Sequence, residues 1–240
     1  MDPPTAATAL VAAAGEGLVG DAAAAEPGLP AGDPMPTEPV EGCVFCYPEL
    51  TPAPLAETQS LRLVPDLYPV APGHLLVISK PHLACFGAAP TAALDELEEL
   101  SQRARRFIRD SYQLDPVIWE NGVSGQTVFH AHLHLIPVHL EGLIESLAAD
   151  PESVEIDGWE AVRQRYQVHG SYHYAAIGTQ RWLLEGNGAM NWEVRRLIAV
   201  TAGLRFIDGR WARPTTEDDV QMAGRRWREW SASQATPGGP

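Results

Sequence analysis

Residues 126–137 read Gln-Thr-Val-Phe-His-Ala-His-Leu-His-Leu-Ile-Pro, with histidine at every second position in the middle of the stretch. On a β-strand, alternate side chains point to the same face of the sheet. We therefore predict a strand over 127–138 that lines up His130, His132 and His134 on one face and apolar residues on the other. Imidazole can act as a base, a nucleophile or a metal ligand near neutral pH. The spacing therefore predicts a chemical site.

Composition limits the classes of partner. The chain has 240 residues, 45% of them hydrophobic, which is enough for one domain with a real core and an appendage. Its formal net charge of −14 disfavours nucleic-acid polymers and anionic lipid as partners. No stretch is long and apolar enough to span a bilayer, and the N-terminus lacks the basic region of a signal peptide. We expect a cytoplasmic protein.

The three cysteines favour a metal or redox site over a disulfide framework. Cys43 and Cys46 form a Cys-x-x-Cys pair, and Cys85 stands apart from them. An odd number with one close pair is typical of a protein from a reducing compartment. We expect Cys85 to be a buried core thiol.

Three segments follow from the composition along the chain. Residues 1–40 are rich in Ala, Pro and Gly with no Lys or Arg, which predicts a disordered tail. Residues 41–140 show the pattern of a compact α+β unit, and residues 141–240 form a C-terminal extension. In the central unit the predicted strands are 60–64, 75–79, 116–120 and 127–138, with a long helix over 91–113. In the extension we predict a helical turn over 143–149, a hairpin of 172–177 and 180–184, and helices over 192–203 and 216–230.

Three motifs together resemble one known family. Gly125 to Pro137 resembles the signature of the histidine triad family, including the Gly-Gln-Ser/Thr-Val that precedes its histidines. Pro72-Gly73-His74, the apolar run after it and Lys80-Pro81-His82 resemble the family's other segment, with Ser79 where proline is usual. Cys43-Val44-Phe45-Cys46 resembles the opening of many bacterial members. The resemblance covers about residues 41–140.

The resemblance implies a fold and a reaction. The fold is an α+β domain with a five-stranded antiparallel sheet and a long helix, usually paired in a homodimer with a ten-stranded sheet. The reaction is attack on the α-phosphate of a nucleotide. His132 would be the nucleophile that forms a nucleotidyl-histidine intermediate, a role that suits a neutral imidazole held at its other nitrogen. His134 and His74 would meet the phosphate oxygens or orient the nucleophile.

The resemblance also places substrate-binding residues. Gln126 and Thr127 fall where the family has phosphate donors. Asp66 falls where it has a group that binds the ribose hydroxyls, although a plain turn before Tyr68-Pro69 also explains an aspartate here. Asn121 could contact sugar or phosphate, or serve only in an Asn-Gly turn.

A structural Zn²⁺ is the cofactor that the resemblance implies. Zinc-containing bacterial members hold the metal with residues at four matching positions. In this chain the four ligands would be Cys43, Cys46, His82 and His130. A closed Cys₂His₂ site has no open position for substrate, so its role is structural. The alternatives are a redox Cys-x-x-Cys or two buried thiols, and a redox pair would not need His82.

Two features of the extension stay open. Arg195 and Arg196 could reach a substrate phosphate or lie on a solvated helix face, and we favour the solvated face. The extension could also form a lid over one end of the site.

Several functions remain. The leading one is a hydrolase or nucleotidyltransferase acting on a nucleoside phosphoramidate, a dinucleoside polyphosphate or a nucleotide-linked metabolite, with a purine nucleotide as ligand. His134, where transferase relatives usually have glutamine, favours hydrolysis. The alternatives are a non-catalytic nucleotide-binding interaction protein and an enzyme co-opted for a specialised biosynthetic pathway. A DNA-end processing enzyme is disfavoured by the net charge and the lack of a basic arm.

Overall fold

A single antiparallel sheet of eight strands organises the molecule, with the strand order β1-β2-β3-β5-β4-β7-β8-β6. The computed structural model describes residues 38–139, 143–184, 205–207, 210–212 and 217–235. The predicted helix over 192–203, Arg195 and Arg196, and nearly all of the predicted tail lie outside these residues.

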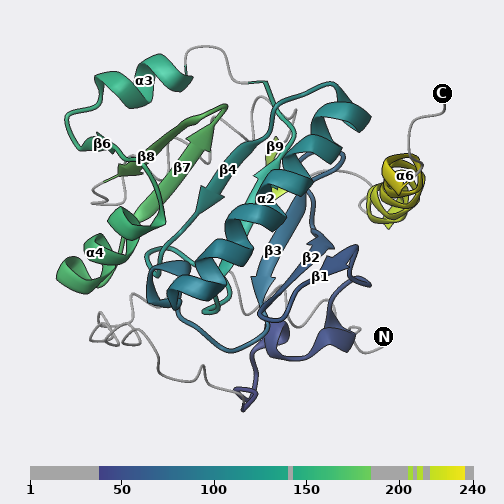
Figure 1. Ribbon diagram of the computed structural model, residues 1–240, viewed down its shortest axis with the longest axis horizontal. Helices are drawn as coiled ribbons and strands as arrows, with labels where there is room; N and C mark the ends of the chain where they lie inside the picture. Colours follow the sequence, from purple (N-terminus) through teal and green to yellow (C-terminus); the bar gives the residue numbers. More distant parts are fainter. Residues whose placement is uncertain (1–37, 140–142, 185–204, 208–209, 213–216, 236–240) are drawn as a thin grey trace.

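The first five strands of the sheet form the predicted five-stranded unit. They are β1 (Ala56–Glu57), β2 (Leu61–Pro65), β3 (Leu75–Ser79), β5 (His132–Ile136) and β4 (Val117–Glu120) in spatial order. The long helix α2 (Thr91–Tyr112) crosses one face of this sheet (Figure 1). The predicted α+β class, with an antiparallel sheet and a long helix, is confirmed. Short 3₁₀ helices η1 (Val44–Cys46), η2 (Pro48–Leu50) and η3 (Phe86–Ala88) lie in the connections.

The extension continues the sheet beyond β4. The predicted hairpin is present as β7 (His173–Ile177) and β8 (Gln180–Leu184), and β7 pairs antiparallel with β4. Strand β6 (Ser153–Glu155) closes the outer edge. Helix α3 (Leu143–Ala149) matches the prediction, whereas α4 (Trp159–His169) and β6 were not predicted. The predicted division into a unit over 41–140 and an extension over 141–240 stays a prediction. One sheet runs through both segments, since β4 of the first pairs with β7 of the second.

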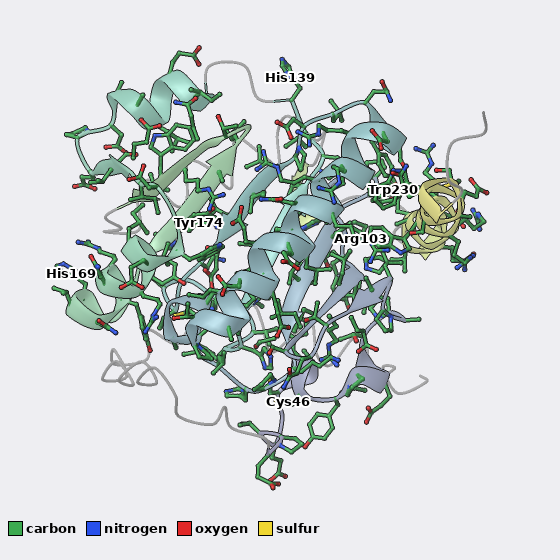
Figure 2. The ribbon with its side chains drawn as sticks, viewed as in Figure 1. Cys46, Arg103, His139, His169, Tyr174 and Trp230 are labelled. Carbon is green, nitrogen blue, oxygen red and sulfur yellow. The ribbon has the colours of Figure 1, made fainter. Side chains whose placement is uncertain are left out.

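The C-terminal helix α6 (Glu217–Ala235) packs on α2 at the opposite side of the molecule from α4 (Figure 1). Figure 2 shows Arg103 of α2 and Trp230 of α6 close together in this contact. Trp230 donates its indole N–H to Asp110, at 2.7 Å. A separate pair, β9 (Arg205–Ile207) and β10 (Arg210–Ala212), forms its own two-stranded sheet. No helix among the described residues is long and apolar enough to cross a membrane.

The two faces of the sheet bury different cores. The face toward α2 holds the larger core, which includes Leu133 and Leu135 of β5 together with Leu97 and Phe107 of α2. The opposite face holds a second core around Trp119 and Trp182, under α3. Alternation along β5 puts His132 and His134 on this second face, away from α2. The fold thus uses one side of β5 for packing and the other for the histidines.

Candidate active site and metal centre

The predicted histidine row is broken at its first member. Residues 127–130 form bends, and β5 begins only at His132. The reason lies in the backbone: the Ala131 N–H donates to the Leu83 carbonyl, at 2.7 Å, so the chain leaves the β3 ladder at this point. The prediction of one strand over 127–138 is therefore wrong in its first half. His130 is fully buried and faces a different cluster from the other two.

That cluster is the predicted metal site. Cys43 precedes η1, Cys46 is its last residue, His82 follows β3, and His130 precedes β5. Their four ligand atoms all lie within 4.8 Å of one another. The Sγ-to-Nδ1 distances are 3.4 Å for Cys43 and His130, and 3.3 Å for Cys46 and His82. A tetrahedral zinc ion with Zn–S about 2.3 Å and Zn–N about 2.0–2.1 Å would place S and N roughly 3.5 Å apart. The donor set and its spacing fit zinc.

The surroundings of His130 also suit a metal ligand. Its Nε2 lies 2.7 Å from the Ser79 carbonyl, which can only accept, so Nε2 carries the proton and Nδ1 offers its lone pair to the cluster. Burial lowers the pKa of His130 to about 4, which keeps the ring neutral at physiological pH. Burial raises the pKa of Cys43, so without a cation its thiol holds its proton more tightly. Bound zinc would supply the positive charge that favours the thiolates.

His132 has the geometry of a nucleophile. Its Nδ1 lies 2.7 Å from the backbone carbonyl of His130. Because a carbonyl only accepts, Nδ1 carries the proton and the lone pair is on Nε2. The ring is buried, at 6% exposure, and sits edge-on to His134 with centroids 4.9 Å apart. A fixed tautomer with a held ring is what nucleophilic catalysis by imidazole requires.

Three further side chains gather beside His132. His74 Nε2 and His134 Nδ1 are 3.0 Å apart, and His74 is buried. Asp66 Oδ2 lies 3.3 Å from His74 Nδ1 and 3.9 Å from His134 Nδ1. The structure therefore brings together His74, His132 and His134, with Asp66 beside the Nδ1 atoms of both His74 and His134.

An apolar cluster adjoins the nucleophile, and sequence reasoning missed it. It consists of Val64, Leu76 and Ile78 on β2 and β3, with Phe45 packed against them. The Phe45 ring lies 5.2 Å from the His132 ring and 5.8 Å from the His130 ring, centroid to centroid. The sequence feature that could have revealed this contact is the position of Phe45 between Cys43 and Cys46, which places an aromatic ring beside the metal site.

A buried guanidinium holds this segment in place. Arg62 is 3% exposed, and its Nη2 donates to the Phe45 carbonyl. Burial lowers the pKa of Arg62, and the nearby Cys43 and Cys46 oppose this shift. The guanidinium thus ties the segment between the two cysteines to β2.

The remaining predicted substrate residues have other contacts. Asn121 is buried and its Oδ1 accepts the Trp119 indole N–H, at 2.8 Å. Gln126 is buried and its Nε2 donates to the Ala84 carbonyl, at 3.0 Å. Thr127 is exposed. In this structure Asn121 and Gln126 make their hydrogen bonds within the protein. The substrate roles of Asn121, Gln126 and Thr127 stay predictions.

Part of this chain matches a known family and its members. Residues 49–140 match the family described as HIT domain. The adenosine 5'-monophosphoramidase HNT1 of Saccharomyces cerevisiae is 30% identical over 136 residues, which are 55% of this chain and 78% of that protein. A HIT-like protein of Chlamydia trachomatis is 34% identical over 111 residues, 44% of this chain and 92% of that protein. The chain belongs to the HIT family.

Solved structures of histidine triad proteins are also similar to part of this chain. A zinc-bound histidine triad family protein from Mycobacterium smegmatis is 27% identical, covering 53% of this chain and 91% of that one, with a TM-score of 0.37. A histidine triad nucleotide-binding protein from Sulfolobus tokodaii is 32% identical, covering 40% of this chain and 68% of that one, with a TM-score of 0.37. The match to the family model ends at residue 140, where the extension begins.

Proposed function

We propose that this HIT protein hydrolyses a nucleotide conjugate at the α-phosphorus through a nucleotidyl-His132 intermediate. The observation that carries the proposal is the hydrogen bond from His132 Nδ1–H to the His130 carbonyl, which puts the reactive lone pair on Nε2. The HIT relative HNT1 is named an adenosine 5'-monophosphoramidase, which makes nucleoside phosphoramidates the first substrates to test. A dinucleoside polyphosphate or a nucleotide-linked metabolite would use the same step, and transfer to an acceptor other than water is the alternative outcome.

The reaction runs in two displacements. In the first, His132 Nε2 forms a bond to phosphorus as the bond to the leaving amine breaks. The amine departs with the bonding electron pair and takes a proton from solvent. In the second, water attacks phosphorus and gives up a proton, the N–P bond breaks, and the nucleoside monophosphate leaves. Each step replaces one bond to phosphorus, and His132 ends as it began.

The surrounding groups have separate roles in this proposal. Phe45 is the partly exposed member of the apolar cluster and packs on the buried Val64, Leu76 and Ile78, so its ring offers a surface for the flat face of a purine base beside His132. His134 would contact a phosphate oxygen from its Nε2 side. Such a donor stabilises charge that grows in the transition state.

Zinc would be structural in this proposal. Cys43, Cys46, His82 and His130 would hold it, and when bound it would fix η1 and the start of β5 relative to each other. All four donors are used, so His132 stays outside the metal site. The chain's location in the cytoplasm and its pairing into a homodimer stay predictions.

A covalent adduct tests the proposal. Wild-type protein mixed with an adenosine phosphoramidate and quenched in base within one turnover, since the P–N bond to histidine is labile in acid, should gain the mass of one adenylyl group, mapped to His132. His132→Ala should lose the adduct and at least about 10³-fold in kcat/KM. The matched control is His169→Ala, at the surface end of α4 (Figure 2), which should keep both. Turnover by His132→Ala at the wild-type rate would overturn the proposal.

A further inference from the structure

Two backbone groups act on the histidines of the site from opposite sides. The His130 carbonyl accepts from His132, as described above. On the other side, the Val70 N–H points at His74 Nδ1, with N···N 3.3 Å. A backbone N–H can only donate, so this contact requires a lone pair on His74 Nδ1. The neutral ring of His74 then carries its proton on Nε2.

Burial favours the neutral form of the His74 ring. The side chain is 3% exposed, and burial lowers its pKa although Asp66 opposes the shift. Its Nε2–H faces His134 Nδ1 at 3.0 Å and donates to it. His134 therefore uses Nδ1 as an acceptor, and its own proton is on Nε2.

We propose that the Val70 amide, acting through His74, fixes His134 as the Nε2–H tautomer, opposite to the Nδ1–H tautomer of the nucleophile His132. The consequence is a division of roles on one strand: His132 presents an electron pair at Nε2, and His134 presents a hydrogen-bond donor at Nε2. The donor would meet a phosphate oxygen of the substrate. His74 is thus a positioning residue. The contact of His134 with a phosphate oxygen rests on the proposed function, whereas the tautomer of His134 does not.

Asp66 supplies the competing arrangement. Its Oδ2 is also 3.3 Å from His74 Nδ1, while its Oδ1 accepts the Tyr68 N–H at 2.8 Å. If His74 carried its proton on Nδ1 and donated it in a hydrogen bond to the Asp66 carboxylate, then His74 Nε2 would be an acceptor and His134 would carry its proton on Nδ1. The two arrangements give opposite tautomers of His134, so one measurement separates them.

The measurement is ¹⁵N NMR of the zinc-loaded full-length protein labelled at histidine, with no substrate present. We expect the His134 ring to show a protonated Nε2 and an unprotonated Nδ1, and His132 to show the reverse. A His134 ring protonated at Nδ1 would overturn the proposal. The result does not depend on turnover, so it stands apart from the adduct test of the proposed function.

Replacing one amide tests the source of the constraint. An ester at position 70, made by incorporating the hydroxy acid of valine, removes the N–H without changing any side chain, and it also weakens the Pro69 carbonyl as an acceptor. It should mix the two His134 tautomers and lower kcat about tenfold or more with little change in KM. The matched control is an ester at Ala71, which should keep the single tautomer. An unchanged His134 tautomer in the Val70 ester would overturn the proposal.

Side-chain variants give the same test without the ester. His74→Gln keeps an N–H donor toward His134 and should keep part of the activity and the Nε2–H tautomer. His74→Leu removes the donor and should lose both. If His74→Gln and His74→Leu fall equally in kcat and both keep the tautomer, the role of His74 is packing alone.

A second, independent observation concerns the edge of the sheet. The outer edge of β4 is occupied by β7, through the partners Ile118 with Ala176, Trp119 with Ala175 and Glu120 with Tyr174. The Tyr172 N–H donates to the Gly122 carbonyl and extends the pairing. Two like edges can join into a larger sheet only if their backbone groups are available. The other outer strands, β1 and β6, have two and three residues.

Side chains hold the extension on this edge. The Tyr172 hydroxyl donates to Glu120 at 2.7 Å and accepts from Gly87 N–H at 2.8 Å. Arg181 of β8 makes a two-point ion pair with Glu98 of α2, at 2.6 and 3.0 Å. Trp159 of α4 stacks on Tyr174, with centroids 4.6 Å apart.

The geometry points to an edge satisfied within one chain: the extension takes the place on β4 that a second copy would need to continue the sheet. The experiment combines mass by light scattering with hydrogen exchange of residues 117–120 over a hundredfold dilution. We expect protection of these amides to be independent of concentration, and unchanged where the mass shows single chains of 26.0 kDa. A dimer with concentration-independent protection would pair through another surface and still support the inference. Protection that falls together with a dimer on dilution, or no protection in a monomer, would overturn it.

Discussion

The Nδ1 of His132 lies 2.7 Å from the backbone carbonyl of His130, so one residue serves both the candidate metal site and the candidate nucleophile. The side chain of His130 faces the thiols of Cys43 and Cys46, at 3.4 and 3.7 Å from its Nδ1. Its backbone fixes the tautomer of His132. Because the two functions share a residue, we expect loss of the metal to disturb the nucleophile even though zinc would not touch substrate.

Cys46→Ser should remove zinc. A serine hydroxyl stays protonated near neutral pH and is a poor ligand beside neutral imidazoles. We expect one zinc per wild-type chain and well under half of that in the variant, measured by elemental mass spectrometry after dialysis. The matched control is Cys85→Ala, which removes a buried thiol outside the cluster and should keep one zinc. A full equivalent of zinc in Cys46→Ser would show that the cluster is not the metal site.

Ser79→Ala tests the support of His130. The Ser79 hydroxyl lies 3.0 Å from His130 Nε2 and 2.8 Å from the Pro81 carbonyl, while the Ser79 carbonyl accepts from the same Nε2. Partners of ligating histidines change metal affinity about 10–100-fold. Because the carbonyl remains, we expect zinc affinity to fall by about tenfold, measured by competition with a chelating dye. Ser101→Ala, a buried serine of α2, should leave the affinity unchanged. Equal affinities for the two variants would contradict a role for the Ser79 hydroxyl.

Local patterns predicted much of the fold. The strand Leu75–Ser79 follows Pro72-Gly73 as a short apolar run and is found with the predicted bounds. The helix over 91–113 is found over Thr91–Tyr112, since its apolar stripe has a clear period. The hairpin of the extension is also present. These elements depend on neighbours in the chain, which a sequence displays directly.

The features that the sequence did not predict depend on contacts between residues far apart in the chain. His130 leaves the row because its backbone and ring are held by Leu83, Ser79 and the thiols, from other parts of the chain. The tautomer of His134 depends on Val70, which no alternation pattern marks. The Glu120–Tyr172 hydrogen bond joins residues 52 positions apart. Helix α4 has a weak apolar pattern, and its packing on η3 cannot be foreseen from its own residues.

The buried Glu120 should make stability depend on pH. Burial raises its pKa from an ordinary 4.5 to about 7, although Phe86 N–H and the Tyr172 hydroxyl both donate to it. Between these values the folded state binds more protons than the unfolded state. This contribution to the free energy of unfolding is therefore complete below pH 4.5 and is lost as pH rises to about 7. Its size is up to about 3 kcal/mol.

Glu120→Gln should remove this part of the pH dependence. Urea unfolding at a series of pH values from 5 to 8 gives the free energy directly. We expect wild type to lose stability over this range relative to the variant, whose glutamine does not titrate. Glu160→Gln, an exposed site on α4, should follow wild type. Parallel curves for wild type and Glu120→Gln would show that Glu120 titrates with an ordinary pKa.

Helix α6 should depend on one aromatic contact. Trp227 is 4% exposed, lies 5.0 Å from the Phe107 ring, and has the Arg103 guanidinium 5.0 Å from its ring centroid. Replacing a buried tryptophan by alanine costs about 3–5 kcal/mol. We expect Trp227→Ala to lower the free energy of unfolding by about this amount, or to release α6 before the rest unfolds. Met222→Ala, on an exposed position of the same helix, should change it by less than about 0.5 kcal/mol. Urea unfolding followed by circular dichroism measures both variants. Equal stabilities would mean that α6 lies on α2 without contributing to the fold, since its largest buried side chain could then be removed at no cost.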